Sequence, residues 1–115
     1  MQASDRIDRV FAALADPTRR AMLARLARGE ATVNELAAPF DLAQPTISKH
    51  LRVLEDAGLV EQSRVASSRP RRLVVGGVLR EADDWMKPFR AQWEQRFDRL
   101  EAHLETSATK KPRKK

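Results

Sequence analysis

The apolar residues at the start of the chain recur with the spacing of two helices. A first helical stripe is formed by Ile7, Val10, Phe11 and Leu14. Asp16 and Pro17 then favour a new helix, because an N-cap carboxylate followed by proline suits a first turn. This second helix is predicted to end at Gly29, which readily takes a left-handed C-cap conformation. The side chains that it is predicted to bury are Ala21, Met22, Leu23 and Leu26.

A shorter helix, a turn and a longer helix are predicted next. Thr32 and Glu35 have the spacing of a capping box, so the short helix begins there and ends near Pro39. Residues 41–44 form a tight turn, and Pro45 starts a helix that runs to about Ala57. Its inward residues are Ile47, Leu51 and Leu54, and its opposite face holds Pro45, Ser48, Lys49 and Arg52, with Thr46 at the edge. This order of elements is typical of a helix-turn-helix.

After Gly58 the pattern changes from helical to extended. Residues 59–65 and 71–75 are rich in β-branched and apolar side chains, and residues 66–70 between them are polar and basic. The pattern therefore predicts a β-hairpin with a polar tip. A helix-turn-helix followed by such a hairpin is a winged helix, so we predict a mainly α fold with a small β-hairpin wing.

The last predicted helix covers about residues 78–105 and carries most of the aromatic residues. Pro88 falls inside it and predicts a kink or a break near Lys87. Its apolar stripe consists of Trp85, Phe89, Trp93, Phe97, Leu100 and Leu104. Residues 106–115 show no apolar periodicity and predict a disordered basic tail. We therefore expect one domain over residues 1–105, followed by this tail.

The length, the cysteine content and the charge distribution of the chain exclude several classes of function. The 115 residues suit one domain, and the absence of cysteine excludes disulfides, thiolate metal sites and cysteine catalysis. No apolar run is long enough to span a bilayer, and the first residues lack a signal-peptide pattern, which predicts a cytoplasmic protein without membrane contact. Residues 44–80 carry seven basic and three acidic side chains, whereas residues 81–105 carry four and seven. This separation predicts a polyanion partner on one face.

Two segments resemble the ArsR family (SmtB-like) of winged-helix repressors. The first is Ala-Leu-Ala-Asp-Pro-Thr-Arg-Arg at residues 13–20, and the second runs from Gln44 to Val60. With the wing and the last helix, the resemblance covers about residues 5–105. It implies a cytoplasmic homodimer that binds operator DNA and represses transcription, and the last helix is similar to that of a subgroup without metal sites. Ala43 departs from the family, which usually has a serine or threonine before Gln-Pro, and a cap oxygen is lost.

The candidate DNA-binding residues come from the longer helix and the wing. The wing arginines suit a minor groove or the backbone because residues 62–75 contain no acid to neutralise them. The alternative is that the polar helix face is simply solvated. The candidates are Gln44, Thr46, Ser48, Lys49, Arg52, Arg64, Arg69, Arg71 and Arg72.

The apolar stripes of the first and last helices predict a homodimer. The core of a winged helix is supplied by other residues, so the stripes exceed what one small domain needs, although they could also cover their own domain. The candidate interface residues are Ile7, Val10, Phe11, Leu14, Phe89, Trp93, Phe97, Leu100 and Leu104.

Metal sensing and catalysis are not expected. The positions that carry a Cys-x-Cys pair in the family's metal sensors hold Thr32 and Asn34, and Glu101-x-His103 is half of a second family site. Zinc needs three or four protein ligands. His50 flanks the packed side of its helix, which favours a structural role or a single phosphate contact. No cofactor and no enzymatic activity are therefore predicted.

The function predicted from the sequence is a homodimeric, metal-independent, sequence-specific repressor of transcription. Its partners would be double-stranded operator DNA and a second copy of the chain, and a small-molecule inducer remains open. The alternative is a winged helix that serves as a protein-interaction module without specific DNA readout.

Overall fold

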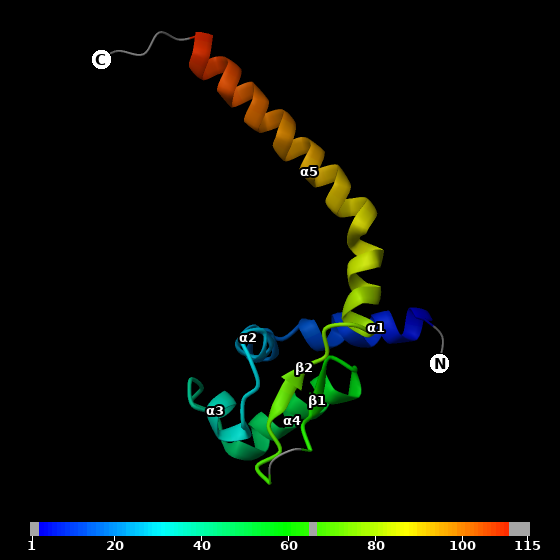
Figure 1. Ribbon diagram of the computed structural model, residues 1–115, viewed down its shortest axis with the longest axis vertical. Coiled ribbons are helices and arrows are strands. Elements are labelled where there is room, and N and C mark those ends of the chain that lie inside the picture. The colour runs from blue at the N-terminus through cyan, green and yellow to red at the C-terminus, as the bar shows by residue number, and fades with distance from the viewer. Residues whose placement is uncertain (1–2, 65–66, 111–115) are drawn as a thin grey trace, which may run out of the picture. The chain divides into compact units, whose positions relative to one another are not determined.

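The computed structural model describes residues 3–64 and 67–110, with side chains over 5–64 and 67–106. The chain divides into one compact unit that ends at Ala82 and a second that begins at Asp83. We describe each unit by itself. Figure 1 labels the elements, which are α1 (Ala3–Leu14), α2 (Pro17–Leu26), α3 (Val33–Ala37), α4 (Gln44–Asp56), β1 (Val60–Gln62), β2 (Arg71–Leu73) and α5 (Val78–Lys110).

The helix starts follow the local signals in the sequence. The Asp16 side chain accepts a hydrogen bond from the backbone N–H of Arg19 at 3.0 Å, and Pro17 occupies the first turn of α2. The capping box of α3 is complete, because Thr32 and Glu35 each bond to the other's backbone N–H. The predictions that one helix begins after Asp16 and another after Thr32 are confirmed.

The end of α2 differs from the prediction. The helix ends at Leu26, and the chain continues in a turn in which Arg28 N–H donates to Arg25 and Gly29 N–H donates to Leu26. Gly29 has a φ of 144°, but it lies beyond the helix and is not its C-cap. Ala21, which was predicted to be buried, is exposed, whereas Met22 and Leu26 are in the core.

The core of the first unit lies where α1, α2, α3 and α4 pack together. α4 contacts α1, α2, α3 and β1, so its inner face is covered on several sides. Ile47, Leu51 and Leu54 are buried, as predicted. The other buried apolar residues are Val10, Ala13, Met22, Leu26, Ala31, Leu36, Ala57, Leu59, Val60 and Ala82.

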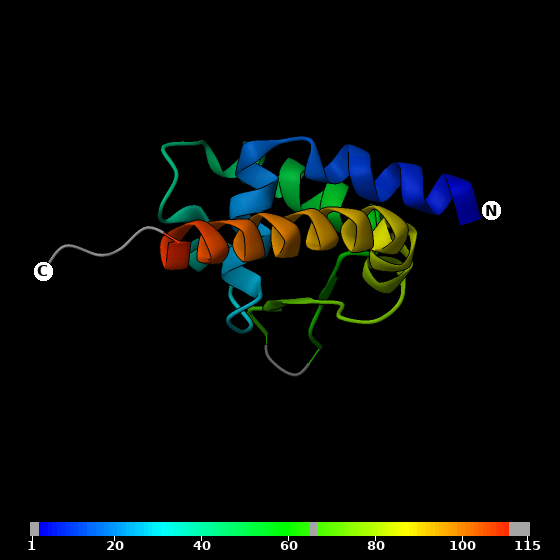
Figure 2. The same ribbon diagram turned by 90° about the horizontal axis from the view of Figure 1, so that it is seen from above.

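The wing is an antiparallel hairpin shorter than predicted. Val60 pairs with Leu73, Glu61 with Arg72, and Gln62 with Arg71. Ser63 N–H still donates to the Pro70 carbonyl at 2.7 Å, but proline has no N–H to return, so the ladder stops there. In Figures 1 and 2 the two strands extend away from α1. Residues 65–66 of the predicted strand lie outside the described residues.

Of the kink or break predicted near Lys87, the break is wrong. α5 is continuous through Pro88 and ends at Lys110, five residues beyond the predicted end. A single proline removes one backbone hydrogen bond, which a long helix with intact turns on both sides tolerates. Residues 111–115, part of the predicted disordered tail, lie outside the described residues.

Candidate nucleic-acid interface

The outer face of α4 is polar and open. Ser48, Lys49 and Arg52 are exposed, and Thr46 is half-buried at the edge of this face. The residues on the opposite side are fixed in the core, so the exposed side chains are held on a rigid element. An α-helix with its side chains is about 10–12 Å wide and fits the major groove of B-DNA.

The start of α4 lacks a side-chain cap, as the sequence predicts. Ala43 occupies the N-cap position and makes no side-chain hydrogen bond, although its carbonyl accepts from the N–H groups of Thr46 and Ile47 at 3.0 and 3.1 Å. Gln44 is the first residue of the helix rather than part of the preceding turn, and its side chain is exposed. Gln44 therefore lies on the same rigid element as Lys49 and Arg52.

The wing arginines divide into two kinds, which corrects the prediction that no acid neutralises them. Arg64 and Arg69 are exposed. Arg72 pairs with Glu61 across the hairpin at 2.5 Å, and Arg71 pairs with Glu55 at 3.0 Å. Glu55 and Glu61 both precede residues 62–75 in the sequence. Strand pairing brings Glu61 close to Arg72, and packing against α4 brings Glu55 close to Arg71. Arg64 and Arg69 are therefore the wing cations better placed to meet an anion.

Arg71 joins the wing to α4. Its Nε donates to Glu55 Oε2, and its Nη1 donates to the Arg69 carbonyl at 2.8 Å. The Arg71 backbone also exchanges hydrogen bonds with Ala31 at 2.7 and 3.0 Å. Arg69 has a φ of 47°, an unfavourable conformation for a residue with a side chain, and the bond from Arg71 helps to hold it. Arg71 is therefore a positioning residue for the wing.

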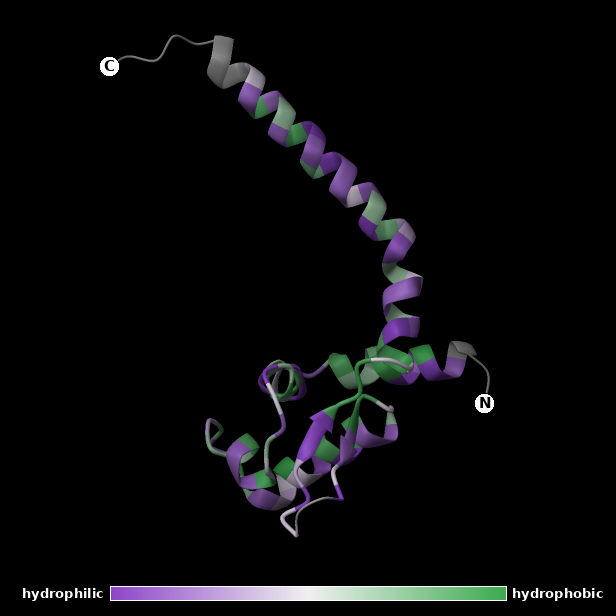
Figure 3. Ribbon diagram, viewed as in Figure 1, coloured by the Kyte–Doolittle hydropathy of each residue, from purple (hydrophilic) through white to green (hydrophobic). Residues whose placement is uncertain are grey.

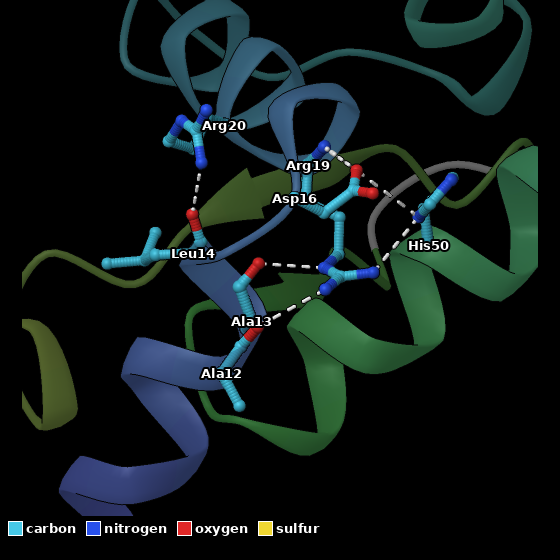
Figure 4. A network of polar contacts seen from close by, with 7 residues as sticks. All are labelled: Ala12, Ala13, Leu14, Asp16, Arg19, Arg20 and His50. Carbon is cyan, nitrogen blue, oxygen red and sulfur yellow. Dashed lines mark hydrogen bonds and ion pairs between the residues drawn. The ribbon is translucent and has the colours of Figure 1, made fainter.

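A polar network ties α4 to the junction between α1 and α2 (Figure 4). Arg19 donates from Nε to the Ala13 carbonyl at 2.7 Å and from Nη2 to the Ala12 carbonyl at 3.2 Å. Its Nη1 lies 3.2 Å from His50 Nδ1, and that nitrogen lies 3.9 Å from Asp16 Oδ2. Since the bound carbonyls belong to the last turn of α1, Arg19 neutralises a helix C-terminus while it contacts α4.

The same network lowers the pKa of Asp16 and gives His50 a contact within the protein. The backbone N–H of Arg19, with smaller contributions from His50 and the Arg19 guanidinium, lowers the pKa of Asp16 below its ordinary value. His50 takes a contact within its own domain, in line with the structural role that its position predicts. The role of Arg19 was missed at the sequence level, although it belongs to the segment 13–20 that carries the family resemblance.

The predicted interface residues are placed differently in the two units. Val10 is fully buried in the core of the first unit, Ile7 and Leu14 are half-buried, and Phe11 is 37% exposed. On α5 the predicted residues Phe89, Trp93, Phe97, Leu100 and Leu104 are 43–64% exposed. Apolar residues recur along α5 between hydrophilic ones in Figure 3. Among the predicted interface residues, Phe11 and those on α5 are the ones that present much apolar surface.

The described residues hold no group of three or more His, Asp or Glu side chains arranged to bind a metal ion. Within the same part of the chain, no helix is both long and apolar enough to cross a membrane.

The short helix α3, the exposed helix α4 and the basic hairpin together define a winged helix-turn-helix protein. Residues 14–63 match the family described as a helix-turn-helix domain. The arsenic resistance transcriptional regulator ArsR1 of Pseudomonas putida is 36% identical over 90 residues, which cover 69% of this chain and 70% of that protein. The transcriptional repressor SdpR of Bacillus subtilis is 38% identical over 58 residues, which cover 50% and 64%.

Solved structures agree with these sequence matches. An ArsR family transcriptional regulator has a TM-score of 0.70 at 39% identity, over 81% of this chain and 95% of that one. A homodimeric winged helix-turn-helix domain from Mycobacterium bovis has a TM-score of 0.57 at 26% identity, over 83% and 84%. The chain belongs to the ArsR family of winged-helix transcriptional regulators. It spans about half to two thirds of the length of the curated relatives that it matches first.

Proposed function

We propose that this protein represses transcription by binding specific DNA sequences as a homodimer, without a metal ion. The observation that carries the proposal is the outer face of α4, where Ser48, Lys49 and Arg52 are exposed opposite a fully packed inner face. The name of the Bacillus relative, a transcriptional repressor, supports the direction of regulation.

The proposed DNA contacts are of two kinds, those to base edges and those to phosphates or the minor groove. Ser48 and Lys49 face outward on α4 and can reach base edges, and Gln44 at the helix start can pair with adenine. Arg52 lies about one turn further on and is placed for a phosphate. Arg64 and Arg69 suit the neighbouring minor groove or backbone because they are exposed and basic. Arg71 holds the hairpin in place through its ion pair with Glu55, and Arg72 is paired with Glu61.

The DNA proposal is tested by removing the two cations of α4. K49Q/R52Q is expected to weaken binding to fragments selected from the source genome by at least about tenfold, since each good base or phosphate contact contributes roughly 1–3 kcal/mol. The salt dependence of the remaining affinity should also become shallower. Binding is measured by fluorescence anisotropy over a salt series.

The matched control is R9Q/R80Q, which removes the same charge from two exposed arginines outside α4 and the wing. It is expected to leave affinity nearly unchanged. Equal losses in both variants would reduce the effect to net charge. Equal affinity of the unmodified protein for selected and random duplex would overturn the proposal of sequence-specific binding, and full retention of a protein partner by K49Q/R52Q would favour an interaction module.

The homodimer rests on the apolar face of α5. Six large apolar side chains from Trp85 to Leu104 are 43–64% exposed, and covering each further would contribute up to about 1.5–3 kcal/mol. A second copy is the occupant that the two-fold symmetry of operators favours, because half-sites lie about 34 Å apart. The homodimeric state of the Mycobacterium bovis domain supports this choice.

Trp93→Glu tests the dimer by placing a charge within the apolar stripe. It is expected to weaken dimerisation by more than about a hundredfold, because a desolvated carboxylate replaces a large aromatic group. Sedimentation equilibrium should then give a mass near 13.0 kDa instead of twice that value. Gln95→Glu is the control, since it adds the same charge on the opposite side of the helix. A monomeric unmodified protein at working concentration would contradict the proposal.

Independence from metal is proposed from the ligand chemistry of the chain. The sequence has no cysteine and two histidines, His50 and His103, and His50 is engaged with Arg19. DNA affinity is therefore expected to be the same in EDTA and in added zinc. A change in affinity on chelation would assign a metal to the protein.

A further inference from the structure

A pocket between α2 and α3 lies outside the proposed DNA-binding face. Its volume is about 470 Å³, within the range of about 300–1,000 Å³ that is usual for small-molecule sites. None of the residues that line it belongs to α4 or to the hairpin. The pocket therefore has no part in the DNA contacts proposed above.

The lining of the pocket is mainly apolar. Met22 and Leu36 lie beneath it in the core and are at most 1% exposed. The apolar surface that faces the space comes from Ala21 and Pro39, which are exposed, and from Phe40, which is partly buried. Ala24 is exposed on α2, and its short side chain leaves the space beside it open. Such a surface favours an apolar molecule, since it offers area but few polar partners.

Two arginines provide the charge of the pocket. Arg25 donates from Nη1 to the Gly29 carbonyl at 3.0 Å and lies near the carboxylate of Glu35. Arg28 is exposed, and its side chain makes no hydrogen bond or ion pair within the described part of the chain. Arg25 is therefore engaged within the chain, and Arg28 is the cation left for an anion.

We propose that this pocket binds an organic anion with an apolar body, such as a medium-chain carboxylate. The apolar body lies against Ala24, Pro39 and Phe40, and the carboxylate meets Arg28. A guanidinium group binds a carboxylate through two parallel hydrogen bonds, which gives the site its charge selectivity.

The site also provides a route to control DNA binding, an extension that rests on the proposed function. α3 supplies one wall of the pocket and packs directly against α4. A ligand between α2 and α3 that binds one arrangement of these helices better would shift the population of α4 positions. The site therefore fits an inducer or a co-repressor of this chemical class.

Binding is tested with the 115-residue chain and three probes that share a ten-carbon chain. ¹⁵N-labelled protein is titrated with decanoate, decanol and decylammonium below their micelle concentrations. Decanoate is expected to cause saturable shifts of the amides of Ala24, Leu36 and Phe40, and the other two probes should bind at least about tenfold more weakly. Equal binding of decanol, or shifts confined to α5, would overturn the proposal.

Two variants locate the charge and the cavity. Arg28→Gln should weaken decanoate binding about tenfold, whereas Arg80→Gln, which removes an exposed charge outside the pocket, should not. Ala24→Leu fills the pocket from an exposed position and should abolish binding of decanoate while the spectrum stays folded. Unchanged decanoate affinity in Arg28→Gln and Ala24→Leu would contradict the assignment.

The effect on DNA is measured separately. Decanoate is expected to change the DNA affinity of the unmodified protein and not that of Ala24→Leu. Decanoate that binds in the pocket but leaves DNA affinity unchanged would overturn the regulatory role alone. If the protein binds DNA but not decanoate, the inference about the pocket fails and the proposed function stands. If it binds decanoate but not DNA, the proposed function fails and the pocket assignment stands.

Discussion

The two units of the chain use apolar residues in opposite ways. In the first unit, Ile47, Leu51 and Leu54 have neighbours from several elements and are at most 2% exposed. In the second unit, whose described residues 83–110 form a single helix, Trp93 and Phe97 are 43% and 64% exposed. The first set stabilises a fold within one chain, whereas no other element among the described residues of the second unit covers the second set. The helical spacing of apolar residues therefore does not show whether they pack within their own chain or against a second chain.

The charged residues differ between the units in the same way. In the first unit, Arg19 and Arg71 bind carbonyl groups and join separate elements. In the second, Lys87 pairs with Asp84 and Arg90 pairs with Asp83 and Glu94, all along one helix. The carboxylate of Asp83 raises the pKa of Arg90, which is charged in any case. Exposed pairs of this kind contribute little to stability.

The difference between the two units is tested most directly by replacing one leucine with alanine in each of them. Leu54→Ala is expected to lower the free energy of unfolding by about 2–5 kcal/mol, because it opens a cavity in a packed core. Leu100→Ala should change it little in solution dilute enough to dissociate the proposed dimer, and should weaken dimerisation at higher concentration instead. Urea unfolding of both variants at low concentration checks this. Equal losses would show that α5 belongs to the core of its own chain.

A smaller effect is expected from the ion pair that anchors the wing. Glu55→Gln removes the charged acceptor of Arg71, whose side chain is only 16% exposed, and should cost about 1–2 kcal/mol. Glu61→Gln is the matched control, since the Arg72–Glu61 pair is about half exposed and should contribute much less. Urea unfolding and hydrogen exchange at the Ala31 and Arg71 amides give the readout. A larger effect of Glu61→Gln would reverse the assignment of the anchor.

The smallest effect concerns the pH dependence of the first unit. The pKa of folded Asp16 lies below its ordinary value of 3.8, mainly because the Arg19 N–H bonds to the carboxylate. The charged form therefore stabilises the fold above the ordinary pKa, and this stabilisation is lost as pH falls through the lower folded pKa. The Tm difference between the unmodified protein and Asp16→Asn should be present at pH 7 and shrink at acidic pH. Asp41→Asn, at an exposed position, should show no such trend; a pH-independent difference for Asp16→Asn would contradict the prediction.

Much of the first unit could be predicted from local sequence. Asp16 and Thr32 mark helix starts because a side-chain oxygen three positions before a free N–H is a local interaction. The inner face of α4 could be predicted because helical spacing places Ile47, Leu51 and Leu54 on one side. The end of α2 was less predictable, because a turn held by hydrogen bonds from Arg28 to Arg25 and from Gly29 to Leu26 ends the helix before the glycine.

The sequence alone determined the order of elements, the polar face of α4 and the apolar face of α5, because these depend on the spacing of residues within one element. Only the tertiary structure decided which wing arginines are paired, that Arg19 binds α1 and His50 together, and that α2 and α3 enclose a pocket beside Arg28. Those features depend on distances between residues far apart in the chain, such as Arg71 and Glu55. Such distances are set by packing rather than by any local pattern.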